Sequence, residues 1–135
     1  MITKQQALEF IYELSQKTEV MLDIACGEVQ FSRIIDGDYQ YTTYSELSTF
    51  ESAVTKCIKE NMDAIECLGI KNIPVDIGML EVGQTYKVHI QQDWEHRTFT
   101  AKFLGFDEVN NYMLRFENYG CTKYDIREIY KVVDR

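Results

Sequence analysis

LEVGQTYKVHIQQDWEHRTFTAKFLGFDEVNNYMLRFENYGCTKYDIREIYKVV, residues 80–133, carries the clearest structural pattern in the chain. Aromatic and β-branched residues recur there in short runs separated by polar, turn-forming residues, which is typical of antiparallel strands. The pattern predicts strands at residues 86–91, 98–106, 112–118 and 124–133. The polar segments 93–96 and 107–111 would supply tight connections, so we expect a compact all-β unit.

This stretch resembles an SH3-like or Sm-like small barrel. The resemblance rests on the order LEVGQTYKVHI, RTFTAKFLGFD, NNYMLRFENYG and YDIREIYKV. It corresponds to a lead-in, a strand, a long bent strand, a hairpin and a short closing strand. Gly105 lies where the long strand would bend. Such barrels bind RNA, bind peptides or dock other proteins, so the resemblance implies binding without choosing a partner class.

The first 73 residues predict helices around a short sheet. Thr3 and Gln6 form a capping box for a helix that ends near residues 15–18. Its expected apolar face consists of Ala7, Leu8, Phe10, Ile11 and Leu14. Strands are predicted at residues 20–25, 28–35 and 38–43, and the pair Asp36-Gly37 favours a two-residue hairpin turn.

A second helix is predicted between Ser48, its expected cap together with Glu51, and Gly69, its expected terminator. Ser45 is an alternative cap one turn earlier. Asn61 falls on the apolar stripe, either as a satisfied buried polar group or as a break in the helix. Residues 69–78 read as a connection. We therefore expect an α+β fold, with an α-β-β-β-α subdomain over residues 1–73 and a small SH3-like β-barrel over residues 79–135.

The chain is acidic, with 22 acidic and 14 basic side chains and a formal net charge of −8. Residues 1–73 carry a net charge of −6 and residues 74–135 a net charge of −2. Such a surface repels nucleic acid and attracts basic partners. No apolar run approaches the roughly 20 residues that span a bilayer. Without a signal peptide or a C-x-x-C motif, the sequence predicts a cytoplasmic protein whose four cysteines are free thiols.

Residues capable of metal binding or catalysis form no recognisable motif. His89 and His96 are expected on a strand and in a turn, and the cysteines lack the close spacing of zinc ligands, so we expect no metal and no cofactor. A Cys–His enzyme would pair His96 with Cys121, which is expected in an exposed turn. The remaining candidates for acid–base chemistry are Asp36, Asp38, Asp107 and Glu108. Each is expected in a turn, where a carboxylate has a structural role. We therefore expect no enzymatic activity.

Protein binding through acidic and aromatic groups is the favoured interpretation. Tyrosine rings bury area at low entropic cost, and carboxylates beside them attract lysine and arginine. The candidate partner-binding residues are Asp36, Asp38, Tyr39, Tyr41, Tyr44 and Glu46 on or beside the hairpin, and Trp94 in the second half. The alternation leaves open whether Tyr39 and Tyr41 face outward or into the core.

We expect a non-enzymatic inhibitor or adaptor that binds a basic protein surface. The most specific version of this hypothesis is a nucleic-acid mimic that occupies the basic groove of a nuclease. It is based on an analogy of size and charge with small anti-restriction and anti-CRISPR proteins. The alternative is an RNA- or peptide-binding regulator acting through the barrel, where basic residues lie among aromatic ones. A homodimer through the edge of strand 38–44, and a small-molecule pocket between the halves, are further alternatives.

Overall fold

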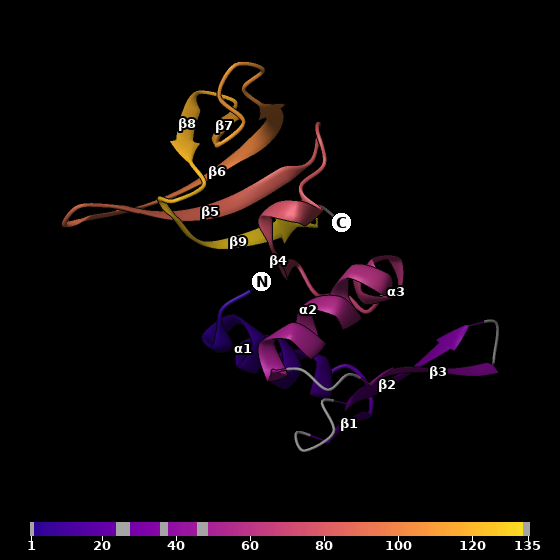
Figure 1. The fold of residues 1–135 in the computed structure, drawn as a ribbon. Coiled ribbons are helices and arrows are strands. Elements are labelled where there is room, and N and C mark those ends of the chain that lie inside the picture. The colour runs from indigo at the N-terminus through magenta and orange to yellow at the C-terminus, as the bar shows by residue number, and fades with distance from the viewer. Residues whose placement is uncertain (1, 24–27, 36–37, 46–48, 134–135) are drawn as a thin grey trace. The chain divides into compact units, whose positions relative to one another are not determined.

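The structure is a computed structural model that describes residues 2–23, 28–35, 38–45 and 49–133. For residues 21–23, 28–35 and 38–45 it describes the backbone. The chain divides into two units, residues 1–70 and residues 71–134 (Figure 1). Among the described residues, no helix is both long and apolar enough to cross a membrane.

The first helix, α1, spans Lys4–Ser15 and begins at the predicted capping box. The Gln6 backbone N–H donates to Thr3 Oγ1 at 3.1 Å, and the Thr3 backbone N–H donates to Gln6 Oε1 at 3.1 Å. The buried positions of this helix are Gln6, Ala7, Phe10 and Leu14. Leu8, which was predicted to lie on the buried face, is 49% exposed, so the buried stripe is narrower than the sequence indicated.

The predicted second helix is two helices, α2 (Phe50–Glu60) and α3 (Met62–Cys67). Asn61 separates them with φ −125° and ψ 26°, and its side-chain Nδ2 donates to the Cys57 carbonyl at 2.9 Å. Of the two roles left open for Asn61, the helix break is therefore the one observed, with the amide satisfied. Gly69, at φ +83°, ends the helical segment as predicted.

The N-cap of α2 is Thr49, whose Oγ1 accepts a hydrogen bond from the Ser52 backbone N–H at 3.3 Å. The predicted cap, Ser48, lies outside the described residues. The alternative cap, Ser45, is wrong because it belongs to a strand. A threonine oxygen serves the same purpose as serine at this position, so the sequence placed the start of the helix within one residue.

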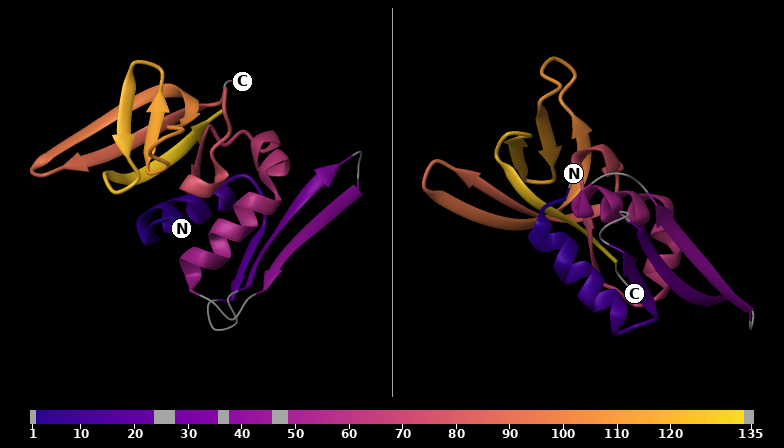
Figure 2. Two further views of the ribbon diagram at one scale, coloured as in Figure 1. Left: turned by 45° about the horizontal axis from the view of Figure 1, so that its top comes forward. Right: turned by 60° about the horizontal axis from the view of Figure 1, so that its bottom comes forward.

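The sheet of the first unit contains β1 (Val20–Asp23), β2 (Glu28–Ile35) and β3 (Asp38–Ser45) in antiparallel order β1-β2-β3. The β2–β3 register runs from Glu28 opposite Ser45 to Ile35 opposite Asp38, which confirms the predicted hairpin. Its turn, Asp36-Gly37, lies outside the described residues. Helix α2 contacts α1, β2 and β3, and α1 contacts β1 (Figure 2).

The second unit is a six-stranded antiparallel sheet in the order β4-β9-β5-β6-β7-β8. Its strands are β4 (Asn72–Val75), β5 (Thr85–Gln92), β6 (Glu95–Phe106), β7 (Met113–Phe116), β8 (Tyr119–Thr122) and β9 (Ile126–Val132), and the 3₁₀ turn η1 (Ile77–Met79) lies between β4 and β5. The chain is therefore a mixed α+β protein. No ladder joins β4 to β8 in the described part of the chain, so the sheet is open.

Two of these strands were not predicted. Strand β4 was read as part of a connection, but it contains Pro74 and forms an edge of the sheet, where the missing backbone N–H of proline is tolerated. Strand β8 was read as a turn, yet it follows a two-residue turn in which Asn118 has φ +68°. Asparagine adopts this left-handed conformation more readily than most residues, which allows the tight reversal.

Strand β6 bends so that one strand serves both halves of the sheet. Its first part pairs with β5, its last part pairs with β7, and the register shifts between Phe103 and Gly105. Gly105 has φ +121°, and the bend lies where the sequence predicted it. The bend lets aromatic rings from both parts meet, because Phe99 and Phe103 each lie 5.3 Å from the Phe116 ring, centroid to centroid.

Gly105→Ala should lower the free energy of unfolding by about 1–3 kcal/mol, because a Cβ atom disfavours this φ. The space itself is open, since the nearest atom to an added Cβ is Val82 Cγ2 at 3.7 Å. Gly120→Ala is the matched control, because Gly120 has no positive φ and its nearest neighbour would be 3.8 Å away. Urea unfolding checks both variants, and equal losses would contradict a conformational role for Gly105.

Candidate functional site

The predicted acidic hairpin is only partly within the described residues. Asp36 and Glu46 lie outside them. Asp38, Tyr39, Tyr41 and Tyr44 belong to β3, where Tyr39 is opposite Ile34, Tyr41 is opposite Ser32 and Tyr44 is opposite Val29. This register fixes the backbone pairing alone, so the binding role of the hairpin side chains stays a prediction.

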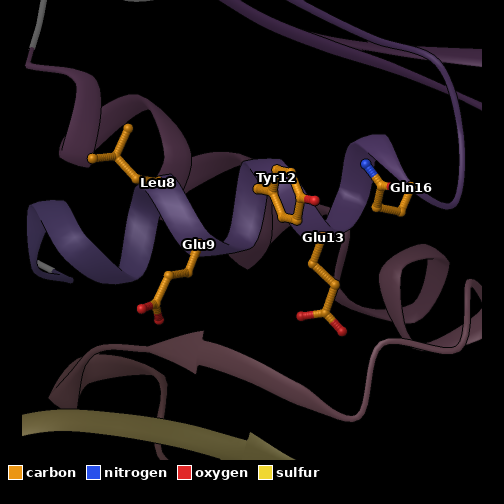
Figure 3. Close-up of a pocket in the computed structure, with 5 residues that line it drawn as sticks. All are labelled: Leu8, Glu9, Tyr12, Glu13 and Gln16. Carbon is orange, nitrogen blue, oxygen red and sulfur yellow. The ribbon is translucent and has the colours of Figure 1, made fainter.

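Among the residues whose side chains the structure describes, a surface of the predicted chemistry lies on α1. Leu8 is 49% exposed, Tyr12 is 70% exposed, and the side chains of Glu9 and Glu13 are also exposed. Together with Gln16 these residues line a surface depression, and we call the five the α1 surface. Figure 3 shows Glu9 and Glu13 extending from the same side of the helix, beside Tyr12. The α1 surface therefore combines carboxylates with an exposed aromatic ring.

Helical geometry explains how these residues come together. Leu8, Tyr12 and Gln16 are spaced at i and i+4, so they form one row along the helix, and Glu9 and Glu13 form the adjacent row. The buried stripe of Ala7, Phe10 and Leu14 lies on the other side. The sequence analysis assigned Leu8 to the core. The signal that it missed is a second row at helical spacing, Leu8 and Tyr12, on the side of the helix away from that stripe.

The carboxylates of the α1 surface are free to meet a cation. Glu9 Oε1 accepts a hydrogen bond from the Gln5 side chain at 2.8 Å. Neither Glu9 nor Glu13 forms an ion pair with any residue whose side chain the structure describes. Like charges at i and i+4 destabilise a helix by about 0.2–0.5 kcal/mol, so a cation placed between them would also relieve repulsion.

Trp94 is the one predicted partner-binding residue whose side chain the structure describes, and it is 95% exposed. It occupies the turn between β5 and β6 next to Asp93, which has φ +54°. The pairing of β5 with β9 ends at Ile90 opposite Ile126, so the end of the β5–β6 hairpin projects beyond β9 (Figure 1). Trp94 contributes nothing to the core and presents its ring to solvent.

Two arginines of the second unit are paired with carboxylates. Arg97 pairs with Glu95 at 3.1 Å and Arg115 pairs with Asp107 at 2.6 Å. Hydrogen bonds from the backbone N–H groups of Asn110 and Val109, together with the Arg115 guanidinium, hold the pKa of Asp107 below its ordinary value. Asp107 thus has the turn-forming role that the sequence predicted.

The cysteines that the structure describes are free, but Cys121 does not lie where it was predicted. It was expected in an exposed turn and is instead buried in β8, opposite Leu114, because alternate residues of that strand face the core. Burial raises the pKa of the Cys121 thiol to about 11 and that of the buried Cys57 thiol to about 12. Both thiols are protonated at neutral pH and are poor nucleophiles.

His96 also departs from the prediction, because it lies in β6 rather than in a turn. Its Nδ1 is 3.1 Å from Nε2 of His89 on β5, and the ring centroids are 5.2 Å apart. The described residues contain no cluster of three or more His, Cys, Asp or Glu side chains arranged to hold a metal ion. The two imidazoles nevertheless meet, which seven residues of separation alone did not reveal.

Comparison with protein-family models, with curated proteins and with solved structures finds no match for this chain. Functional assignment therefore depends on the chemistry of its surfaces. Large apolar side chains are exposed beside polar ones on the α1 surface of the first unit and in the hairpin turn with Trp94 of the second unit. The second unit also exposes other large apolar side chains, among them Val82, Leu104, Val109 and Tyr124.

The exposed and buried cysteines should differ in the rate at which their thiols react. In a Cys26→Ser background at pH 8, one thiol should react rapidly with Ellman's reagent, and this thiol should be Cys67, which is exposed. Cys57 and Cys121 should react more than about 100-fold more slowly, because burial suppresses their thiolate forms. Rapid reaction in the Cys26→Ser, Cys67→Ser double variant would contradict the burial of the other two.

Proposed function

We propose that this chain is a non-enzymatic binding protein that holds a basic protein surface through its acidic first unit. The observation that carries the proposal is the α1 surface, where Glu9 and Glu13 lie beside the exposed Tyr12 and Leu8. The carboxylates attract and orient a partner rich in lysine or arginine, and the tyrosine ring supplies apolar area that is buried on binding.

Both kinds of group are needed for useful affinity. An exposed ion pair contributes only about 0.2–1 kcal/mol, and salt screens charges beyond about 8 Å at physiological ionic strength. Burying an aromatic anchor contributes more, and aromatic residues are enriched among those that dominate interface energies. The exposed Tyr12 and the net charge of −8 therefore act together, the charge favouring encounter and the ring favouring retention.

The partner class that fits this chemistry best is a nucleic-acid-binding enzyme with a basic groove. An acidic protein that occupies such a groove competes with the phosphates of the nucleic acid, as a nuclease inhibitor of the anti-restriction or anti-CRISPR type would do in the cytoplasm. Within this proposal, the hairpin residues Asp36, Asp38, Tyr39, Tyr41, Tyr44 and Glu46 extend the acidic contact. Trp94 is a separate anchor on the second unit.

For the second unit we propose an opened relative of the SH3-like barrel. The long β6, its bend at Gly105 and the aromatic contacts around Phe116 support this assignment. The alternative function, RNA binding through this unit, has weaker support because Arg97 and Arg115 are already paired with carboxylates. Phosphate binding depends on several unneutralised basic residues acting together.

Charge reversal tests the proposal. The immobilised chain is used to capture proteins from a lysate of its source cells, and a captured basic protein is then purified for affinity measurements. Glu9→Lys with Glu13→Lys should weaken its binding by about tenfold or more, because two attractions become repulsions. Tyr12→Ala should weaken binding with the thermal stability unchanged, since the ring is exposed.

Glu108→Lys with Glu117→Lys is the matched control, because it makes the same change in net charge at exposed positions of the second unit. This control should retain binding nearly in full. Equal losses in both double variants would mean that only overall charge matters. Full binding by the α1 variant would reject the α1 surface, and salt-sensitive binding of RNA by the wild-type chain would favour the alternative.

A further inference from the structure

The two histidines of the chain meet on one face of the second sheet. His89 on β5 and His96 on β6 are diagonal neighbours, offset by two residues in the register, since His89 is opposite Thr98 and His96 is opposite Gln91. Residues Val88 and Ile90, which flank His89, are buried, so alternation places the histidines on the opposite face from the core. His89 is half-buried and His96 is exposed, so both imidazoles are accessible from that face.

The spacing of the two nitrogen atoms suits two ligands of one metal ion. Nε2 of His89 and Nδ1 of His96 are 3.1 Å apart. With Zn–N bonds of about 2.0–2.1 Å, tetrahedral coordination places two ligand nitrogens about 3.3 Å apart, and cis positions of a square plane place them about 2.9 Å apart. The observed separation lies between these values, so the backbone needs no rearrangement to bring the ligands together.

We propose that His89 and His96 form a two-histidine site for a divalent transition-metal ion of the class that prefers imidazole, namely Zn²⁺, Ni²⁺ or Cu²⁺. His89 binds through Nε2 and His96 through Nδ1. The remaining coordination positions are open to water or to a ligand from a partner. This site is on the second unit and is independent of the α1 surface.

Metal binding replaces the contact that the two rings make without it. One of the two nitrogens donates its N–H to the lone pair of the other, so the acceptor's lone pair points toward the donor ring and the donor nitrogen carries the proton. Rotation about the soft terminal torsion of each side chain turns both lone pairs toward a shared point. The shared proton moves to the second nitrogen of its own ring, which leaves both binding nitrogens unprotonated without a change in net charge.

A carboxylate lies on the same face of the sheet as the two histidines. Glu128 on β9 is the register partner of His89, so its carboxylate is carried by the same face of the sheet. Its Oε2 accepts a hydrogen bond from the Tyr130 hydroxyl at 3.1 Å, which holds the carboxylate near that face. Two basic groups also reach this face. Arg127 Nε donates a hydrogen bond at 3.2 Å to Oε1 of Gln91, the register partner of His96, and Lys87 Nζ lies 5.9 Å from the centroid of the Tyr130 ring.

The test uses the untagged full chain carrying Cys26→Ser and Cys67→Ser, with Zn²⁺ as the probe and calorimetry and NMR as readouts. Because the chain contains 2 histidines, every imidazole signal belongs to the pair. We expect saturable binding of one ion per chain and simultaneous shifts of both sets of imidazole resonances. His89→Gln and His96→Gln should each weaken binding by about tenfold or more, since losing a ligand costs at least as much as losing a group that orients one.

Glu117→Gln is the control, because it changes an exposed residue between β7 and β8 and leaves both ligands in place; its affinity should equal that of the parent. Shifts in the signals of one histidine only, binding that survives either glutamine substitution, or unchanged imidazole signals at excess Zn²⁺ would overturn the site. The NMR titration of the parent needs no histidine substitution, so the result stands even where a variant fails to fold.

Discussion

Helix α1 and strand β5 each bury a single face, because side chains repeat every 3.6 residues on a helix and every two residues on a strand. On α1 the buried stripe of Ala7, Phe10 and Leu14 leaves Tyr12 and the two glutamates in solvent. On β5 the burial of Val88 and Ile90 places His89 on the opposite face. The packing of each core therefore determines which groups the protein can offer to a partner or an ion.

The two units use their carboxylates for different purposes. In the second unit Asp107 ties a turn together and pairs with Arg115, so its charge is satisfied within the fold. In the first unit Glu9 and Glu13 have no cationic partner among the side chains described, and they lie beside an exposed ring. The carboxylates of Glu9 and Glu13 are thus available for binding, whereas those of Glu95 and Asp107 in the second unit are paired with arginines.

Local signals were sufficient for much of the fold. The capping box of Thr3 and Gln6, the hairpin of β2 and β3, the bend at Gly105 and the end of the helical segment at Gly69 each follow from a few neighbouring residues. Features that depend on distant partners were missed. Strands β4 and β8 exist because β9 and β7 pair with them, and that same pairing buries Cys121. The contact of His89 with His96 depends on the β5–β6 register, which spacing alone does not give.

The proposed role of the α1 surface is tested most sharply by amide hydrogen exchange of the full chain, with and without a purified basic partner. Binding at the α1 surface predicts slower amide exchange in α1, Lys4–Ser15. The largest effect is expected for the amides from the second turn of the helix onward. Tyr12→Ala should remove this protection. Protection confined to residues 71–134, with α1 exchanging as fast as in the unbound chain, would contradict the proposal.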